Sequence, residues 1–133
     1  MLLEKPFRVA ILPTKYVFEV NKSEDGLVPN RGIEVKFLEV LSQCMHFKYT
    51  VVQPQDGEYG QKLDDGWWTG MIGLIVRQKA DFALNMIAST QARREVVDFS
   101  FPYSIDGTTF FTGPLHYYRK DWHIFIHSIP FCG

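Results

Sequence analysis

The sequence predicts an α/β fold in which helices cover a mostly parallel sheet. Short apolar segments, partly β-branched, alternate along the chain with segments of helical periodicity. Hydrophobic residues make up 46% and charged residues 22% of the 133 residues, so a packed core is expected rather than disorder. Because such sheets bind ligands at the carboxyl ends of their strands, the loops that follow the strands are the first place to look for a site.

The first half of the chain supplies two expected strands and one helix. Residues 7–12 are apolar and partly β-branched, which predicts a buried strand. Residues 21–30 contain Ser, Asp, Gly, Pro and Asn and are expected to form a loop. A helix over residues 32–45 and a strand over residues 47–52 follow. The expected buried face of that helix consists of Ile33, Phe37, Val40, Leu41 and Cys44.

The middle of the chain repeats this pattern. Residues 54–66 are polar and contain glycine, so we expect a loop there. Residues 68–79 predict a helix, and residues 81–85 predict a brief strand. The side chains expected to point inward from that helix are Met71, Ile72, Ile75 and Val76.

The last expected elements lie beyond residue 88. Ser89 or Thr90 can cap a short helix that runs through Glu95, because a hydroxyl oxygen accepts a free amide of a first turn. Residues 96–99 are expected to be extended, and residues 107–112 to form a last strand.

Charge and residue types exclude several classes of function. The net charge is −1 and no face is obviously basic, so neither nucleic acid nor an anionic membrane surface is an expected partner. No apolar run approaches the roughly 18 residues of a membrane span. His123 and His127 have the spacing of a metal pair on a helix but lack a third ligand, so we expect no metal and no cofactor. Cys44 and Cys132 could form a disulfide, but we expect Cys44 to be a buried apolar residue.

The most informative stretch runs from residue 80 to residue 103. A strand leads there to the start of a short helix, and Arg93 follows one turn later. Exposed amides at a helix start attract anions, and a guanidinium beside them can hold a carboxylate through two parallel hydrogen bonds. The alternative is that Arg93 and Arg94 pair with Glu95 or Asp98 on the surface, and the residues alone favour this alternative.

Five ordered motifs shift that balance. They are D-G-E-Y-G at 56–60, W-T-G-M-I-G at 68–73, A-D at 80–81, Arg93, and E-V-V-D-F-S at 95–100. Together they resemble the first ligand-binding segment of ionotropic glutamate receptors. The resemblance implies one lobe of a type II periplasmic-binding-protein-like clamshell, incomplete in this chain. It also implies a first segment over residues 1–113, followed by a tail, residues 114–133, that leads toward a missing first transmembrane helix.

The same resemblance implies a ligand site. Arg93 is expected to bind the carboxylate of the ligand, and Tyr59 to cover it. The carbonyl of Met86 and the main chain of Ala88 are expected to complete the cradle on this lobe. Met86 replaces a proline of the family pattern, and Ala88 replaces a threonine, so that a hydroxyl is lost. These departures resemble those of divergent, chemosensory-type ionotropic receptors.

The function implied is ligand binding in a ligand-gated cation channel, and not catalysis. The ligand is expected to be an amino acid or a small carboxylate, with lobe closure coupled to a pore that this chain lacks. The full receptor is expected to be a homo- or hetero-tetramer in the plasma membrane, with this region extracellular and a possible glycan on Asn21. The alternative is a free-standing periplasmic-type amino-acid-binding protein. An enzyme on the same fold has no catalytic set to support it.

Overall fold

A computed structural model of the protein describes residues 5–107, 109 and 111. The chain divides into two compact units, residues 1–102 and residues 103–133. All helices and strands found in the described residues belong to the first unit. The expected tail over residues 114–133 lies outside the described residues, so its boundary remains a prediction.

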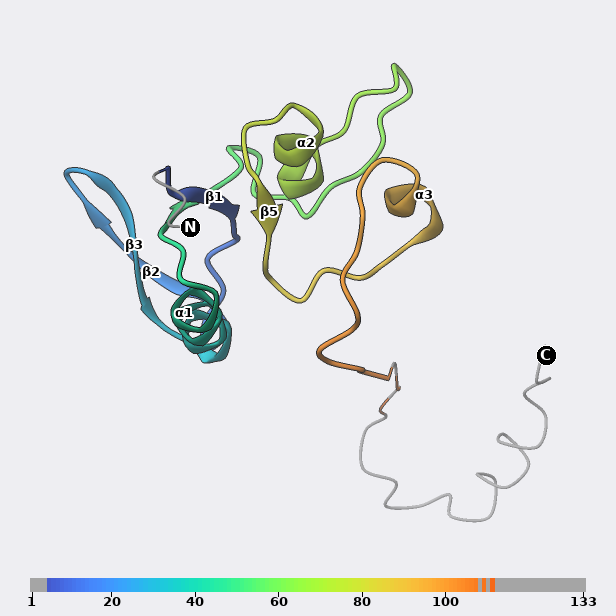
Figure 1. Cartoon of the computed structure of the whole chain (residues 1–133). Helices are drawn as coiled ribbons and strands as arrows, with labels where there is room; N and C mark the ends of the chain where they lie inside the picture. Colours follow the sequence, from blue (N-terminus) through green and yellow to red (C-terminus); the bar gives the residue numbers. More distant parts are fainter. Residues whose placement is uncertain (1–4, 108, 110, 112–133) are drawn as a thin grey trace, which may run out of the picture. The chain divides into compact units, whose positions relative to one another are not determined.

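The first unit is built on a parallel sheet of three strands (Figure 1). Strand β1 (Phe7–Ala10) lies between β4 (Tyr49–Val52) and β5 (Phe82–Ala83), and both neighbours run parallel to it. Val9 of β1 lies opposite Val51 of β4. The expected α/β architecture is therefore confirmed, although each strand is shorter than its apolar segment.

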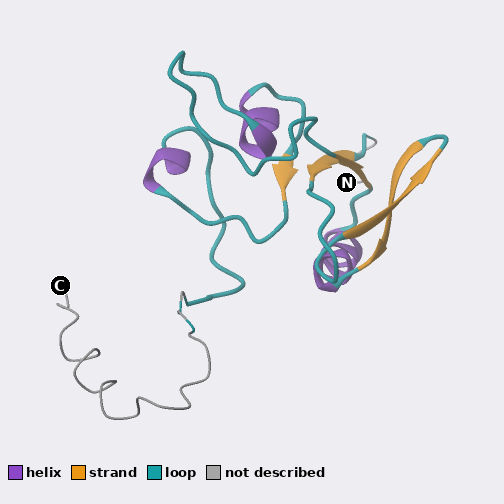
Figure 2. Cartoon of the chain, turned by 180° about the vertical axis from the view of Figure 1, so that it is seen from behind, coloured by secondary structure: helices purple, strands orange, loops and turns teal. Residues whose placement is uncertain are grey.

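A separate antiparallel hairpin precedes the first helix, and here the expected loop over residues 21–30 was wrong. Strand β2 (Glu19–Ser23) pairs with β3 (Gly26–Arg31) (Figure 2). Its turn residues stand between two short alternating segments, and Leu27 of β3 packs against the core. The polar residues of the turn led to the prediction of a loop, although apolar and polar residues alternate on both sides of it. Asn21 lies exposed on β2, and its glycosylation remains a prediction.

Helix α1 (Ile33–Met45) begins one residue later than expected, ends at the expected residue and buries a different face. Its buried residues are Glu34, Val35 and Leu38. By contrast, the expected core residues Ile33 and Val40 are 70% and 57% exposed. In the same way Phe37 and Cys44 are exposed rather than buried. Periodicity counts apolar side chains only, so a buried carboxylate shifts the true face away from the apparent one.

Helix α2 (Gly70–Val76) is shorter than the expected helix over residues 68–79. Met71 and Ile72 are buried as expected, whereas Val76 is exposed. Gly70 at the first position and Gln78 beyond the last position have φ values of 63° and 57°, which do not continue a right-handed helix.

Helix α3 (Gln91–Arg94) confirms the expected cap. Thr90 is the N-cap, and its hydroxyl oxygen accepts the Arg93 amide at 3.3 Å. The chain does not become extended at once, because the amide of Val97 still bonds to the carbonyl of Arg93 at 3.0 Å. Residues 96 and 97 therefore turn instead of being extended as expected, and the described part of residues 107–112 contains no strand.

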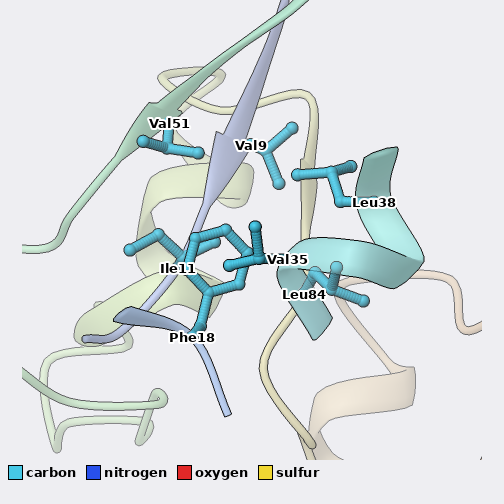
Figure 3. Close-up of a cluster of buried hydrophobic side chains, with 7 residues drawn as sticks. All are labelled: Val9, Ile11, Phe18, Val35, Leu38, Val51 and Leu84. Carbon is cyan, nitrogen blue, oxygen red and sulfur yellow. The ribbon is translucent and has the colours of Figure 1, made fainter. Parts of the chain in front are cut away.

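The core has two layers because alternate residues of β1 point to opposite faces of the sheet. Val9 and Ile11 lie in a cluster with Val35 and Leu38 of α1 (Figure 3). Ala10 and Leu12 lie in a second cluster, which Met71 of α2 joins. The sheet thus carries α1 on one face and α2 on the other, and the loops at the carboxyl ends of its strands remain available for a site.

Candidate functional site

Arg93 joins the loop after β4 to the loop after β5. Its Nη2 and Nε donate to the carbonyl oxygen of Gly60 at 3.0 Å and 3.3 Å, and its Nη1 donates to the carbonyl oxygen of Ala88 at 2.8 Å. The residue is half-buried. These bonds place the guanidinium at the carboxyl ends of two parallel strands, where α/β sheets bind ligands.

The alternative of a surface ion pair is wrong for Arg93. The two ion pairs found among the described residues, Arg8 with Asp81 and Arg31 with Glu19, do not involve it. Its neighbour Arg94 is exposed and donates from Nε to the hydroxyl of Ser89 at 2.8 Å. The two adjacent arginines therefore have different surroundings, and only Arg93 bridges the two loops.

The bonds of Arg93 leave donors for a further acceptor. A guanidinium has five N–H groups, and Arg93 directs one from each of its three nitrogens to the two carbonyl oxygens. Counting only the described residues, one N–H remains on each terminal nitrogen. Two such groups form the fork that binds a carboxylate through parallel hydrogen bonds.

Tyr59 is held by its main chain over the start of α2. The carbonyl of Tyr59 accepts the amide of Ile72 at 3.1 Å, and the carbonyl of Glu58 accepts the amide of Met71 at 3.1 Å. These bonds satisfy amides that a helix start leaves free. The tyrosine side chain is 40% exposed, so the loop presents it at the surface rather than in the core.

Two glycines make this close packing possible. A Cβ on Gly60 would lie 2.5 Å from the Cβ of Ile72, and a Cβ on Gly70 would lie 2.3 Å from the carbonyl oxygen of Glu58. Asp56 adds a further bond, because its Oδ2 accepts the amide of Gly70 at 2.9 Å. The amide of Gly70, followed by that of Glu58, lowers the pKa of the Asp56 carboxyl. The D-G-E-Y-G and W-T-G-M-I-G motifs are therefore two halves of one loop-to-helix junction.

The A-D motif has a different role, at the opposite ends of the strands. The Oδ2 of Asp81 accepts the main-chain amide of Arg8 at 2.7 Å, and its Oδ1 accepts the Nη2 of Arg8 at 3.0 Å. The side-chain hydrogen bond from Arg8 lowers the pKa of Asp81, and the amide of Arg8 adds to this shift. This pair fixes the start of β5 against β1 and lies away from the candidate site.

Two polar residues at the base of the site were missed by the sequence reasoning. Asn85 is 1% exposed, and its Nδ2 donates to the carbonyl oxygen of Leu12 and, at 3.4 Å, to the hydroxyl of Thr14. Glu34 is 3% exposed, and its Oε1 accepts the amide of Met86 at 2.8 Å. Asn85 is a polar residue inside an otherwise apolar segment, which is a signal for a buried polar contact, whereas Glu34 shares its helix with Lys36 and Glu39 and gave no such signal.

Met86 and Ala88 are the residues expected to complete the ligand cradle, and this role remains a prediction. Both are exposed in the loop after β5. Met86 has a φ of 48°, in the left-handed region, which a proline ring cannot adopt. The main chain at Met86 therefore follows a path that the proline of the family pattern could not take. Ala88 turns its carbonyl toward Arg93.

Comparison with known proteins decides the family. Residues 2–114 match the family model of the ligated ion channel L-glutamate- and glycine-binding site. The chain belongs to this family of ionotropic glutamate receptor ligand-binding domains. A probable glutamate receptor of Anas platyrhynchos is 39% identical over 95 residues, which cover 69% of this chain and 20% of that protein. The delta-1 ionotropic glutamate receptor of Mus musculus is 40% identical over 73 residues, covering 55% of this chain and 7% of that protein.

Solved glutamate receptor ligand-binding domains share the fold. A Mnemiopsis leidyi receptor domain in complex with D-serine is 22% identical with a TM-score of 0.66, covering 77% of this chain and 42% of that one. Drosophila muscle GluRIIB in complex with glutamate is 25% identical with a TM-score of 0.66, covering 75% and 40%. The chain thus spans less than half of each solved domain, which confirms an incomplete clamshell with one partial lobe.

The described part of the chain contains neither a helix that could span a membrane nor a cluster of potential metal ligands. None of its helices is both long and apolar enough to cross a membrane. It also contains no cluster of three or more His, Cys, Asp or Glu side chains that could hold a metal ion. His123 and His127, the pair considered from the sequence, lie outside the described residues.

Proposed function

We propose that this chain is the first lobe of a receptor clamshell and that Arg93 captures the carboxylate of a small amino acid or related acid. The observation that carries the proposal is the bridge from Arg93 to the carbonyls of Gly60 and Ala88. It holds a half-buried cation between two loops at the carboxyl ends of the strands, with two N–H groups directed to neither carbonyl. Helix α3 has only four residues, so its amides add little and the guanidinium supplies most of the attraction.

The neighbouring residues have supporting roles in this proposal. Tyr59, presented by the junction with α2, covers the ligand from one side. The main chain of Met86 offers a carbonyl to the ammonium of an amino acid. Ala88 has no hydroxyl for the ligand, and the loss of one hydrogen bond to a charged group costs about 1.5–3 kcal/mol, or roughly ten- to a hundredfold in affinity. We therefore expect weaker binding than at a site with threonine in this position.

The ligand class follows from the arginine and from the solved relatives. Those domains were solved with glycine, D-serine or glutamate, each of which carries an α-carboxylate. The guanidinium of Arg93 suits this shared carboxylate. The missing hydroxyl at Ala88 weakens discrimination among the ligands that carry it. A small amino acid or carboxylate is thus the substrate class of the proposed site, and no catalytic step is part of it.

In the full receptor, ligand binding would close two lobes and open a cation pore. A ligand can drive closure only by binding the closed state more tightly than the open state, so a second lobe must supply the remaining contacts. The full protein would be a tetramer in the plasma membrane, with residues 1–113 extracellular and residues 114–133 leading toward a membrane helix. A glycan on the exposed Asn21 is compatible with that placement.

The test is a titration of the isotopically labelled chain with glycine, D-serine and L-glutamate, followed by NMR at the main-chain amide of Ala88, which every variant retains. We expect millimolar binding, because half a site leaves the amine side open to water. Arg93→Lys should abolish the response, because an ammonium cannot form the planar fork. The matched control is Arg94→Lys, which changes an exposed arginine one position away and should leave binding intact. Equal binding by both variants would refute the anchor role, and micromolar binding by this chain would refute the half-site.

A further inference from the structure

A buried carboxylate supports the loop that follows β5. Glu34 lies in the first turn of α1, and its side chain is 3% exposed. Its Oε1 accepts the main-chain amide of Met86 at 2.8 Å, across a separation of 52 residues. Glutamate is almost never fully buried unless it is paired, so this contact is the first candidate reason for placing a charged residue there.

The main chain of Met86 needs such support. Its φ of 48° lies in the left-handed region, which is uncommon for a residue with a long side chain. Conformations of this kind persist only where the surroundings hold them. The side chain of Met86 is 47% exposed, so packing alone does not hold the residue. The hydrogen bond from its amide to Glu34 is a direct restraint on this main chain.

This short loop is restrained at three of the four positions from Asn85 to Ala88. Asn85 is bonded to the carbonyl of Leu12, two residues beyond the end of β1. Met86 is bonded to Glu34 of α1, and Ala88 is bonded to Arg93 of α3. Gly60 and Ala88 together fix the position of the Arg93 guanidinium, and the place of the Ala88 carbonyl depends in turn on the anchor at Met86.

We propose that Glu34 is a positioning residue for the ligand site. It holds the strained main chain of Met86, and through residues 86–88 it sets the place of the Arg93 guanidinium, without touching the ligand itself. The ligand part of this inference rests on the proposed function of Arg93. The structural part, the anchoring of Met86, is independent of any ligand.

Hydrogen exchange tests the structural part. The wild-type Met86 amide should exchange slowly although its residue is exposed. Glu34→Ala should lower the protection of the Met86 amide, relative to that of Val9 in β1, by about tenfold or more. Glu34→Gln keeps an acceptor oxygen and should retain this ratio within about threefold. Leu38→Ala is the matched control, because it destabilises the same helix from the core without a bond to the loop.

Each outcome decides the structural part. Exchange of the wild-type Met86 amide at the rate of an unstructured peptide would overturn it, even if Glu34→Ala fails to fold. A selective loss at Met86 that Leu38→Ala reproduces would also overturn it, since general destabilisation would then be the cause. Selective loss in Glu34→Ala with retention in Glu34→Gln would support it.

The ligand part is tested by the same titration of the labelled chain with glycine, D-serine and L-glutamate. We expect Glu34→Ala to weaken binding about tenfold and Glu34→Gln to stay within about threefold of wild type. If Glu34→Ala loses the protection of the Met86 amide but binds these ligands with unchanged affinity, the positioning role is overturned and the proposed function stands. Undiminished binding by Arg93→Lys would instead overturn the proposed function, whatever the exchange data show at Met86.

Discussion

Arg93 donates from Nη2 to the carbonyl oxygen of Gly60, 33 residues earlier in the sequence, at a distance of 3.0 Å. The bond joins the loop after β4 to the helix that follows β5. Gly60 is itself buried, and its carbonyl accepts two hydrogen bonds from the Arg93 side chain. The same guanidinium is therefore both the candidate ligand anchor and a structural clasp.

Arg93→Ala should therefore lower stability even without ligand. Leaving a buried carbonyl without its donor costs about 1–3 kcal/mol in the free energy of unfolding. Urea denaturation measures this cost, and Arg94→Ala is the control, because Arg94 is exposed and should change stability by less than about 0.5 kcal/mol. If the two variants unfold at the same urea concentration, the hydrogen bonds from Arg93 to Gly60 do not stabilise the fold.

Gly60→Ala should destabilise the junction between the loop and α2. Gly60 has a φ of 139°, and a Cβ there would lie 2.5 Å from the Cβ of Ile72, so both the main chain and the helix would have to shift. We expect a loss of roughly 2–4 kcal/mol, which thermal denaturation can measure. Gly57→Ala in the same loop is the matched control. It also has a positive φ, of 67°, but a Cβ there meets no atom within 4 Å. Equal losses would show that steric contact with Ile72 is unimportant.

Acid should weaken the fold through Asp81 and Asp56. Hydrogen bonds hold the pKa of both carboxyls below the ordinary value, Asp81 through Arg8 and Asp56 through the amide of Gly70. A carboxyl with a depressed pKa stabilises the fold above its unfolded pKa of about 3.9, and this contribution is lost as pH falls through the folded value. Urea denaturation at pH 7 and at pH 3 should therefore show lower stability in acid.

Asp81→Asn separates this effect from general acid unfolding. The variant should be less stable than wild type at pH 7 and should lose less on acidification, because the titrating partner of Arg8 is gone. Asp25→Asn, in the exposed turn of the β2–β3 hairpin, is the control for removal of one negative charge. A wild-type-like loss in acid for Asp81→Asn would mean that this carboxyl is not responsible.

The sequence predicted the arrangement of the sheet better than the contacts of the site. Apolar, β-branched segments predicted β1, β4 and β5, and the hydroxyl of Thr90 predicted the start of α3, because these are local properties of the chain. Arg93 could be selected as a candidate through its motif. Its partners are main-chain carbonyls, however, and every residue carries a carbonyl, so no residue type could indicate Gly60.

The buried face of α1 failed for a related reason. The spacing of Ile33 and Phe37 predicted a buried face that included both residues. The helix instead buries Val35, Leu38 and the charged Glu34. A carboxylate becomes acceptable in the interior only when a donor meets it, and that donor is the amide of Met86, far away in sequence. Periodicity does not reveal long-range hydrogen bonds of this kind, so the partners of Glu34 and Asn85 could be identified only in the folded chain.

Asn85 provides the sharpest test of the base of the site. Its Nδ2 donates to the carbonyl of Leu12, and the residue is 1% exposed. Asn85→Ala removes this donor and should cost about 1–3 kcal/mol. Asn85→Asp places a carboxylate oxygen against the same carbonyl in the interior, and at pH 7 we expect a larger loss of roughly 3–5 kcal/mol.

The pH dependence separates the two variants. Burial and the neighbouring carbonyl should raise the pKa of the introduced Asp above its unfolded value, because both disfavour the charged form. Its protonated carboxyl can donate to Leu12 as the amide of Asn85 does. The difference in stability between Asn85→Asp and wild type should therefore shrink as pH falls from 7 to about 4, whereas the difference for Asn85→Ala should stay constant. Urea denaturation across this range measures both. Parallel pH profiles for the two variants would show that the side chain of residue 85 does not need to donate to Leu12, and that the loop after β5 is anchored by another contact.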